Sequence, residues 1–311
     1  MQIGDWSEGT MKYYVGIDIG GTNIKYGLLT ETGEILHHDK VKTVLSGKDI
    51  LQHIEEIIKN YQKEYLIKGV GVSAPGTVQA DGFMTTGGAI MDFYGVNLKE
   101  LIMERVDLPV KVENDVNTIA LAEKWLGGGR EFSSFACLAV GTGIGGALII
   151  NNELYRGRWG SAGEFGYMIT EPVVNDNTRS STLSLTGSVR SGLIKRYSTI
   201  SGNAEKIDGA EIYQRAEKGE AAAIETLDLF HKNLSEGIFN LLVSLDPEII
   251  LIGGAISENT TFIAELNRRV KKLQADYSQM SNLTFAEVAP CRFFNNAGII
   301  GGVYGILKEQ I

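Results

Sequence analysis

Short apolar runs alternate along this chain with longer segments in which apolar residues recur at helical spacing. The runs are rich in β-branched residues, which is typical of buried strands, and the segments of helical period predict amphipathic helices. Because the two kinds of element alternate, the pattern predicts an α/β protein. The predicted strands include Tyr13–Ile19, Ile67–Val72, Phe135–Val140, Glu248–Ile252 and Leu283–Val288, and the predicted helices include Lys48–Tyr65, Thr118–Leu126, Ala221–Leu245 and Gly298–Lys308.

The order of the predicted elements occurs twice. Each half opens with a strand, a glycine-rich turn and a second strand, at Tyr13–Leu29 and at Phe135–Ile150, and continues with alternating helices and strands. This duplication predicts two α/β domains with a cleft between them, spanning residues 1–118 and 119–311. The last helix, at about residues 297–311, is expected to pack back onto the first domain.

Both opening strands run into glycine-rich turns that carry a threonine, IDIGGT at Ile17–Thr22 and VGTGIGG at Val140–Gly146. Glycine lets backbone N–H groups approach an anion, and threonine adds a hydroxyl donor. Plain hairpins can also contain such turns, but two of them in one chain favour a polyphosphate site and a nucleotide-dependent enzyme. The predicted phosphate-binding residues are Gly20, Gly21, Thr22, Gly141, Thr142, Gly143, Gly145 and Gly146.

Two better known nucleotide motifs do not explain these turns. Gly141, Gly143 and Gly146 match G-x-G-x-x-G, but that motif opens a helix in dinucleotide-binding folds. Here the following residues, Ala147–Ile150, have the pattern of a strand. The P-loop pattern G-x-x-x-x-G-K-[ST] does not occur in the sequence.

Asp18 ends the first strand beside the first glycine-rich turn. A carboxylate there would repel phosphate unless a divalent cation lay between them, which predicts Mg²⁺ at Asp18. The alternative is that Asp18 accepts hydrogen bonds from local backbone amides. Lys25, on the next strand, either contacts phosphate or faces water.

Polar residues also follow a predicted strand at Glu113–Asn117. Asp115 could cap the next helix or accept the proton of an alcohol that attacks a terminal phosphate, and these two roles are compatible. Asn114 suits hydrogen bonds to vicinal hydroxyls. Glu164 lies between glycines in a loop, where it is either a solvated carboxylate or a ligand of sugar hydroxyls.

The bulk composition narrows the class of partner. The 311 residues carry a formal net charge of −9, which argues against sequence-independent binding to nucleic acid or anionic membranes. No apolar run has the length that crosses a bilayer, and the polar start lacks the features of a secretory signal. Residues 1–10 precede Met11 and are interpreted as an extension or a tag. The only cysteines are Cys137 and Cys291. Cys137 lies within an apolar strand pattern and is expected to be a buried, reduced thiol, so cytoplasm is the expected location.

Five segments resemble the ROK (repressor, open reading frame, kinase) family of sugar kinases. They are DIGGT at 18–22, ENDVN at 113–117, VGTGIGG at 140–146, AGEFGYM at 162–168 and LIGGAI at 251–256, in the order and spacing of the family over residues 13–308. The resemblance implies the actin-like ATPase (ribonuclease H-like) fold, with two α/β domains around a central cleft that holds ATP and a sugar. It also implies a homodimer.

The same resemblance implies roles for single residues. Asp115 would be the general base, and Asn114 and Glu164 would bind the sugar. Gly253 and Gly254 would lie beside the adenosine of ATP. Further segments resemble the bacterial β-glucoside kinases of the family, and on that basis Gly76, Gly88 and Tyr167 join the sugar-binding residues. These segments are SAPGTV at 73–78, TTGGAI at 85–90, GEFGYM at 163–168 and NNAGIIGGVY at 295–304.

The chain also departs from the family pattern. Most members have histidine at the position of Tyr167, followed by a C-x-C-G-x-x-G-C zinc cluster, whereas Asn175–Thr186 contains no cysteine or histidine. We therefore expect no structural zinc. A glutamate that contacts the sugar in the family is replaced by a small hydroxylated residue near Thr182. Loss of these groups near the anomeric carbon would leave room for an aglycone.

The sequence thus predicts an ATP-dependent kinase for the 6-hydroxyl of a glucosyl unit in a β-glucoside such as cellobiose. N-acetylmannosamine kinase, fructokinase and glucokinase of the same family are the alternatives. A sugar-responsive repressor would need an N-terminal helix-turn-helix domain, and only about seventeen residues precede Asp18. A catalytically idle binding module is disfavoured because both phosphate turns and Asp115 are present.

Overall fold

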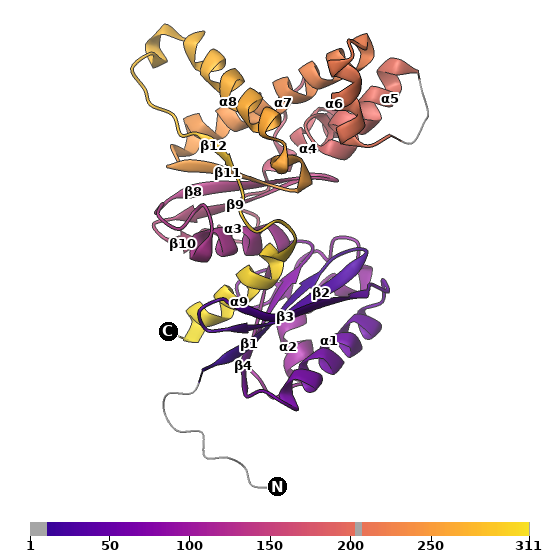
Figure 1. Ribbon diagram of the computed structural model, residues 1–311, viewed down its shortest axis with the longest axis vertical. Coiled ribbons are helices and arrows are strands. Elements are labelled where there is room, and N and C mark those ends of the chain that lie inside the picture. Colours follow the sequence, from indigo (N-terminus) through magenta and orange to yellow (C-terminus); the bar gives the residue numbers. More distant parts are fainter. Residues whose placement is uncertain (1–10, 203–206, 311) are drawn as a thin grey trace. The chain divides into compact units, whose positions relative to one another are not determined.

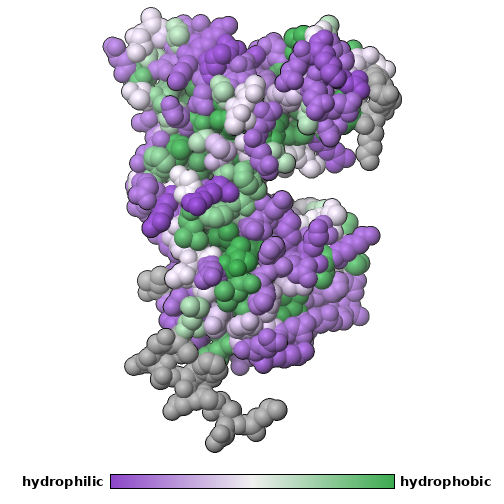
Figure 2. Space-filling model, viewed as in Figure 1, coloured by the Kyte–Doolittle hydropathy of each residue, from purple (hydrophilic) through white to green (hydrophobic). Residues whose placement is uncertain are grey.

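The computed structural model describes residues 11–202 and 207–310, so the predicted extension at residues 1–10 lies outside the described residues. The chain forms two compact units (Figure 1). Unit 1 comprises Met1–Leu126, Arg156–Gly160 and Asn295–Ile311, and unit 2 comprises Gly127–Tyr155 and Ser161–Phe294. Among the described residues, no helix is both long and apolar enough to cross a bilayer. Most residues on the visible face of each unit are hydrophilic, with smaller apolar groups between them (Figure 2).

Unit 1 is built on a five-stranded sheet with the order β3-β2-β1-β4-β7. β2 and β3 run antiparallel to their neighbours, and β4 and β7 continue the sheet in parallel with β1. The elements of this unit are β1 (Tyr13–Ile19), β2 (Asn23–Thr30), β3 (Ile35–Lys42), α1 (Gly47–Gln62), β4 (Ile67–Ala74), β5 (Phe83–Met84), β6 (Val96–Asn97), α2 (Leu98–Met103), β7 (Val110–Asn114), α3 (Asp115–Leu126) and α9 (Ala297–Gln310).

The two faces of the unit 1 sheet differ because side chains alternate along a strand. Val15 and Ile17 of β1 are fully buried in the core that α1 and α2 cover. Gly16, between them, faces α9 on the other side, and Gly71 of β4 approaches α9 so closely that a Cβ would lie 1.9 Å from the carbonyl oxygen of Gly302. Glycine is therefore required where α9 rests on β1 and β4.

Unit 2 repeats the same sheet order as β10-β9-β8-β11-β12. Its hairpin β8–β9 is antiparallel, and β8, β11 and β12 are parallel. A separate apolar core lies beneath α7 and α8. The elements are β8 (Phe135–Val140), β9 (Ile144–Ile150), β10 (Glu153–Leu154), α4 (Leu183–Thr186), α5 (Arg196–Ser201), α6 (Gly209–Glu217), α7 (Ala221–Leu245), β11 (Ile249–Gly253), α8 (Thr260–Ala275) and β12 (Val288–Pro290).

The unit boundary differs from the one expected between residues 118 and 119. The structure divides the chain after Leu126, and α3 stays in unit 1 because it packs against α9, where the rings of Trp125 and Tyr304 stack with centroids 5.2 Å apart. The short segment Arg156–Gly160 also returns to unit 1. The helix expected at about residues 297–311 corresponds to α9, which belongs to unit 1.

Candidate active site

The turn between β8 and β9 is shorter than the VGTGIGG motif. Only residues 141–143 form the turn, which the N–H of Gly141 closes by donating to the carbonyl of Gly143 at 3.0 Å. Gly145 and Gly146 instead lie in β9, opposite Ala139 and Leu138. A Cβ on Gly146 would lie 2.2 Å from the ring of Phe165, so packing explains this glycine.

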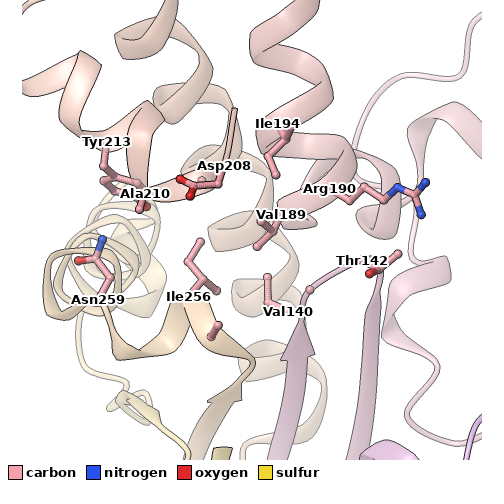
Figure 3. Close-up of a pocket in the computed structure, with 13 residues that line it drawn as sticks. Val140, Thr142, Val189, Arg190, Ile194, Asp208, Ala210, Tyr213, Ile256 and Asn259 are labelled. Carbon is pink, nitrogen blue, oxygen red and sulfur yellow. The ribbon is translucent and has the colours of Figure 1, made fainter. Parts of the chain in front are cut away.

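A pocket of about 600 Å³ lies beside this turn, entirely within unit 2. In Figure 3, Val140, Val189, Ile194 and Ile256 point toward the same space and give it apolar walls. Polar groups stand at its edges, which is the usual composition of a small-molecule site. These are Thr142 and Arg190 on one side and Asp208, Tyr213 and Asn259 on the other.

Gly253 and Gly254 shape the pocket without lining it. Gly253 ends β11, and Gly254 has φ +97°, where a Cβ would lie 2.3 Å from the carbonyl oxygen of Val140. The chain can therefore turn tightly at this point and enter the wall Ala255–Asn259. Gly141 and Thr142 of the predicted turn also line the pocket. Sequence reasoning missed the apolar walls, because Val189 and Ile194 of one helical segment and Tyr213 of α6 are ordinary residue types in helices.

The first glycine-rich turn is the corresponding feature of unit 1. Gly20 donates its N–H to the carbonyl of Asn23 at 3.1 Å and accepts from the hydroxyl of Thr43 at 2.7 Å. Gly21 is exposed, with nothing within 4 Å of the position of a Cβ. Thr22 follows it and is exposed as well. The turn therefore presents its backbone to solvent.

Asp18 lies beside this turn as a carboxylate confined by its neighbours. The hydroxyl of Ser73 donates to its Oδ1 at 2.8 Å, and the Nζ of Lys25 lies 3.8 Å from its Oδ2. A Cβ on Gly298 would lie 2.5 Å from the Asp18 Cγ. Burial raises the pKa of Asp18, although the Ser73 hydrogen bond and the Lys25 charge act in the opposite direction. Lys25 also donates to the carbonyl oxygen of Asn295 at 3.3 Å.

These residues fit a Mg²⁺ ion that arrives with a nucleotide. Mg²⁺ prefers oxygen ligands and usually takes one or two carboxylates together with substrate phosphates and water. Asp18 offers one carboxylate, and its Oδ2 lies 3.8 Å from the Nζ of Lys25. Over residues 11–202 and 207–310, no three side chains among His, Cys, Asp and Glu come together as a metal site.

Asn114 and Asp115 mark the junction of β7 with α3. The helix begins at Asp115, three residues before the predicted Thr118, because the Asn114 Oδ1 accepts the N–H groups of Val116 at 2.9 Å and Asn117 at 3.1 Å. The Asn114 Nδ2 donates to the carbonyl of Gly76 at 2.7 Å and to the Asp115 Oδ1 at 2.9 Å.

Asn114 thereby uses both donors and both acceptors of its amide within the protein. Any contact of Asn114 with a sugar has to replace one of these bonds. The Asp115 side chain is exposed at the start of the helix and also accepts the N–H of Val116 at 2.9 Å. The arrangement thus fixes the orientation of an exposed carboxylate.

Gly76 and Gly88 are neighbours next to Asn114. Gly76 has φ +95° and Gly88 has φ +58°, and a Cβ on Gly76 would lie 2.8 Å from the N of Gly88. Tyr94 donates its hydroxyl to the carbonyl of Gly88 at 3.2 Å. The structure thus brings Gly76, Gly88, Asn114 and Asp115 into one cluster within unit 1.

Glu164 and Tyr167 lie in unit 2, at a short helical turn Phe165–Tyr167. Burial raises the pKa of Glu164, so its carboxylate is partly removed from water. Tyr167 is 75% exposed. Thr182, near the position of the missing glutamate, donates its hydroxyl to the carbonyl of Arg179 at 2.9 Å.

Two sheets of identical topology, each opening with a hairpin around a glycine-rich turn, define the actin-like ATPase fold. Residues 14–309 match the ROK family, and the chain belongs to it. A β-glucoside kinase of Listeria monocytogenes is 37% identical over 295 residues, which are 94% of this chain and 97% of that protein.

Two solved structures extend the comparison. The Lmo2764 protein of Listeria monocytogenes, a candidate N-acetylmannosamine kinase, is 35% identical with a TM-score of 0.86, and the match covers 97% of this chain and 100% of that one. A ROK glucokinase from Streptomyces griseus, solved with glucose and AMPPNP, is 26% identical with a TM-score of 0.76 and matched coverages of 94% and 98%. The chain is a carbohydrate kinase that uses ATP.

Proposed function

We propose that this kinase phosphorylates the 6-hydroxyl of the non-reducing glucosyl unit of a β-glucoside such as cellobiose. The observation that carries the acceptor assignment is the fixed carboxylate of Asp115, held by Asn114 beside the Gly76 turn. The named Listeria relative is a β-glucoside kinase, which favours this substrate class. Tyr167, which is exposed, and the small Thr182 stand where most family members have a histidine and a glutamate, which favours room for an aglycone.

The nucleotide is assigned to the pocket of unit 2. The adenine ring fits the apolar walls at Val189 and Ile256, and the ribose lies among the polar groups at the edge. The phosphates then receive backbone N–H groups from the turns at Gly20–Thr22 and Gly141–Gly143. Mg²⁺, when bound, would supply positive charge to the phosphates, and Asp18 would be its protein ligand.

The proposed reaction is the transfer of the γ-phosphoryl group of ATP to the sugar 6-hydroxyl. The sugar 6-oxygen attacks the γ-phosphorus, the bond from phosphorus to the β–γ bridging oxygen breaks, and ADP leaves with the electron pair. Asp115 takes the proton of the hydroxyl as the new bond forms. Glu164 orients the sugar by accepting from its hydroxyls, and its desolvation strengthens that contact. No structural zinc takes part in this scheme, and the working assembly is a homodimer.

A panel of acceptors tests the substrate. Purified protein is assayed for ADP release with cellobiose, gentiobiose, glucose, fructose and N-acetylmannosamine, each with Mg·ATP. We expect the highest kcat/KM with the two β-linked disaccharides. A clear preference for glucose or fructose would refute the β-glucoside assignment. A preference for N-acetylmannosamine would support the second candidate, which the similarity to Lmo2764 favours.

A further inference from the structure

A buried carboxylate stands directly before the Asn114–Asp115 pair. The side chain of Glu113 is 2% exposed, and the mechanism above gives it no role. Its Oε1 accepts the backbone N–H of Asn114 at 3.0 Å and the Nδ2 of Asn117 at 2.8 Å. Glu113 therefore binds the main chain just before Asp115, at Asn114, and the first turn of α3 just after it, at Asn117.

A buried anion is tolerated only where a charge and hydrogen bonds compensate for its lost hydration. Arg156 provides that charge, with its Nε 2.7 Å and its Nη2 2.5 Å from the Glu113 Oε2. The two N–H groups of the rigid guanidinium fix the direction of approach, which a lysine could not do. Three hydrogen bonds and the ion pair with Arg156 therefore hold both oxygens of the Glu113 carboxylate in place.

Arg156 does not come from the elements that surround Glu113. It begins the segment Arg156–Gly160, which belongs to unit 1 although the residues before and after it belong to unit 2. The other end of the segment is fixed as well, because Gly160 has φ +79° and a Cβ there would lie 2.7 Å from the carbonyl oxygen of Val78. The chain then continues to Glu164.

We propose that Glu113 and Arg156 form a positioning pair for the acceptor site. Glu113 sets the position of Asn114 and Asp115, and Arg156 holds the Glu113 carboxylate in the orientation in which it does so. This inference rests on the proposed function, since Asp115 is the base of that reaction. Neither residue touches the substrate in this scheme, and both act through Asp115.

The variant Arg156→Met tests the pair, because it removes the cation and leaves the carboxylate buried. We expect kcat to fall about 10- to 100-fold, the order produced by a misplacement of about 1 Å at a reacting group. The Kd of Mg·ADP should stay within about 2-fold of the wild-type value, because the pocket residues lie in unit 2. Arg156→Lys should recover part of the loss, since it keeps the charge without the fork.

The double variant Glu113→Gln with Arg156→Met separates positioning from simple charge loss. It removes the uncompensated anion, so its kcat should exceed that of Arg156→Met. The matched control is Arg269→Met, which breaks ion pairs with Glu265 of α8 and Asp228 of α7 in unit 2. Arg269 is not among the residues that line the pocket, so that control should change stability while leaving kcat at the wild-type value.

Hydrogen exchange of peptides covering residues 113–118 gives a readout that needs no catalysis. Arg156→Met should exchange faster there than the wild type, and Arg269→Met should not. Wild-type kcat and wild-type exchange in Arg156→Met would overturn the proposal, as would equal losses of kcat in the Arg269 control. If the wild-type protein phosphorylates no sugar in the panel, the proposed function fails, and the exchange data still decide whether the pair orders this segment.

Discussion

At the scale of single residues, Asn114 and Asp115 have different roles: Asn114 fixes the local structure, and Asp115 carries the exposed carboxylate. The amide of Asn114 is consumed by hydrogen bonds inside the protein, and one of these holds the Asp115 Oδ1. Asp115 therefore has a fixed orientation before a sugar arrives. In the proposed mechanism, preorganisation of this kind would lower the barrier, because the general base does not have to be immobilised during the reaction.

The variant Asp115→Asn tests the base directly. Asparagine has nearly the same shape but cannot take the proton, so kcat should fall about 10²- to 10⁴-fold while the Kd of the sugar changes little. ADP release and calorimetry measure the two quantities. Asp276→Asn, at the exposed C-terminus of α8, is the matched control and should keep full activity. Near-normal turnover in Asp115→Asn would remove the general-base assignment.

The motif residues could be found from sequence, but their hydrogen bonds could not. Gly20, Asp18 and Asp115 stand in recognisable spacings, so the sequence points to them. The four bonds of Asn114 depend on where the Gly76 turn comes to rest, which is set by packing between distant segments. Arg156 carried no signal either, because an arginine in a loop is usually solvated.

At the scale of elements, α9 is fitted to the sheet through glycines. A Cβ on Gly301 would lie 1.7 Å from the backbone oxygen of Thr118, whereas one on Gly305 would meet only side-chain atoms at 3.5 Å and beyond. The same helix thus contains one glycine that packing requires and one that it tolerates. Backbone against backbone leaves no room for relaxation by a rotamer change.

This contrast gives a prediction for two alanine variants of α9. Gly301→Ala should lower the free energy of unfolding by about 3 kcal/mol or more, the upper end of overpacking costs, because backbone must shift. Gly305→Ala should be neutral or raise it by up to about 1 kcal/mol, since alanine favours the helix. Denaturant midpoints at equal m-value measure both. Equal midpoints for the two variants would contradict the proposed packing.

Elements in which apolar residues recur with a clear strand or helix period were predicted well, and elements without such a period were not. The predicted strand Tyr13–Ile19 and helix Ala221–Leu245 are confirmed with the same bounds. The predicted strand Leu283–Val288 is wrong, because β12 begins only at Val288 and residues 283–287 have no regular structure. An apolar run alone does not say whether a neighbouring strand edge is available for pairing.

At the scale of the whole molecule, each unit has its own apolar core, so buried groups in one core affect the stability of that unit. His231 of α7 is buried in unit 2 among Phe230 and Phe262. Burial lowers its pKa to about 4, the charge of Arg269 adds to this, and the contact with the Leu227 carbonyl opposes it. The Nε2 of His231 is 2.9 Å from the hydroxyl of Tyr213.

Unit 2 should therefore lose stability as the pH falls from about 6.5 toward about 4. In that window the unfolded chain binds a proton at His231 and the folded chain does not, which favours unfolding by at most about 3 kcal/mol. Urea unfolding followed by circular dichroism at pH 7, 6 and 5 should show a shallower pH slope for His231→Gln than for the wild type. Identical slopes would contradict a neutral, buried His231.

Glu265 provides an internal reference for that measurement. Its pKa is lowered to about 2, mainly by the hydrogen bond from Arg268, with Arg269 adding to the effect. Its stabilising contribution is therefore lost only between about pH 4.5 and 2, below the window of His231. The two groups can be distinguished by the pH at which the loss begins.

The path of the chain through unit 1 has a consequence for biosynthesis. A ribosome delivers β1 and β4 first, yet the glycine-bearing face of these strands stays bare until Asn295–Gln310 has also been synthesised. The nascent protein must carry an unfinished unit 1 through the synthesis of all of unit 2. A stop codon before Asn295 would release a polypeptide with an open sheet surface, suited to capture by chaperones or to aggregation.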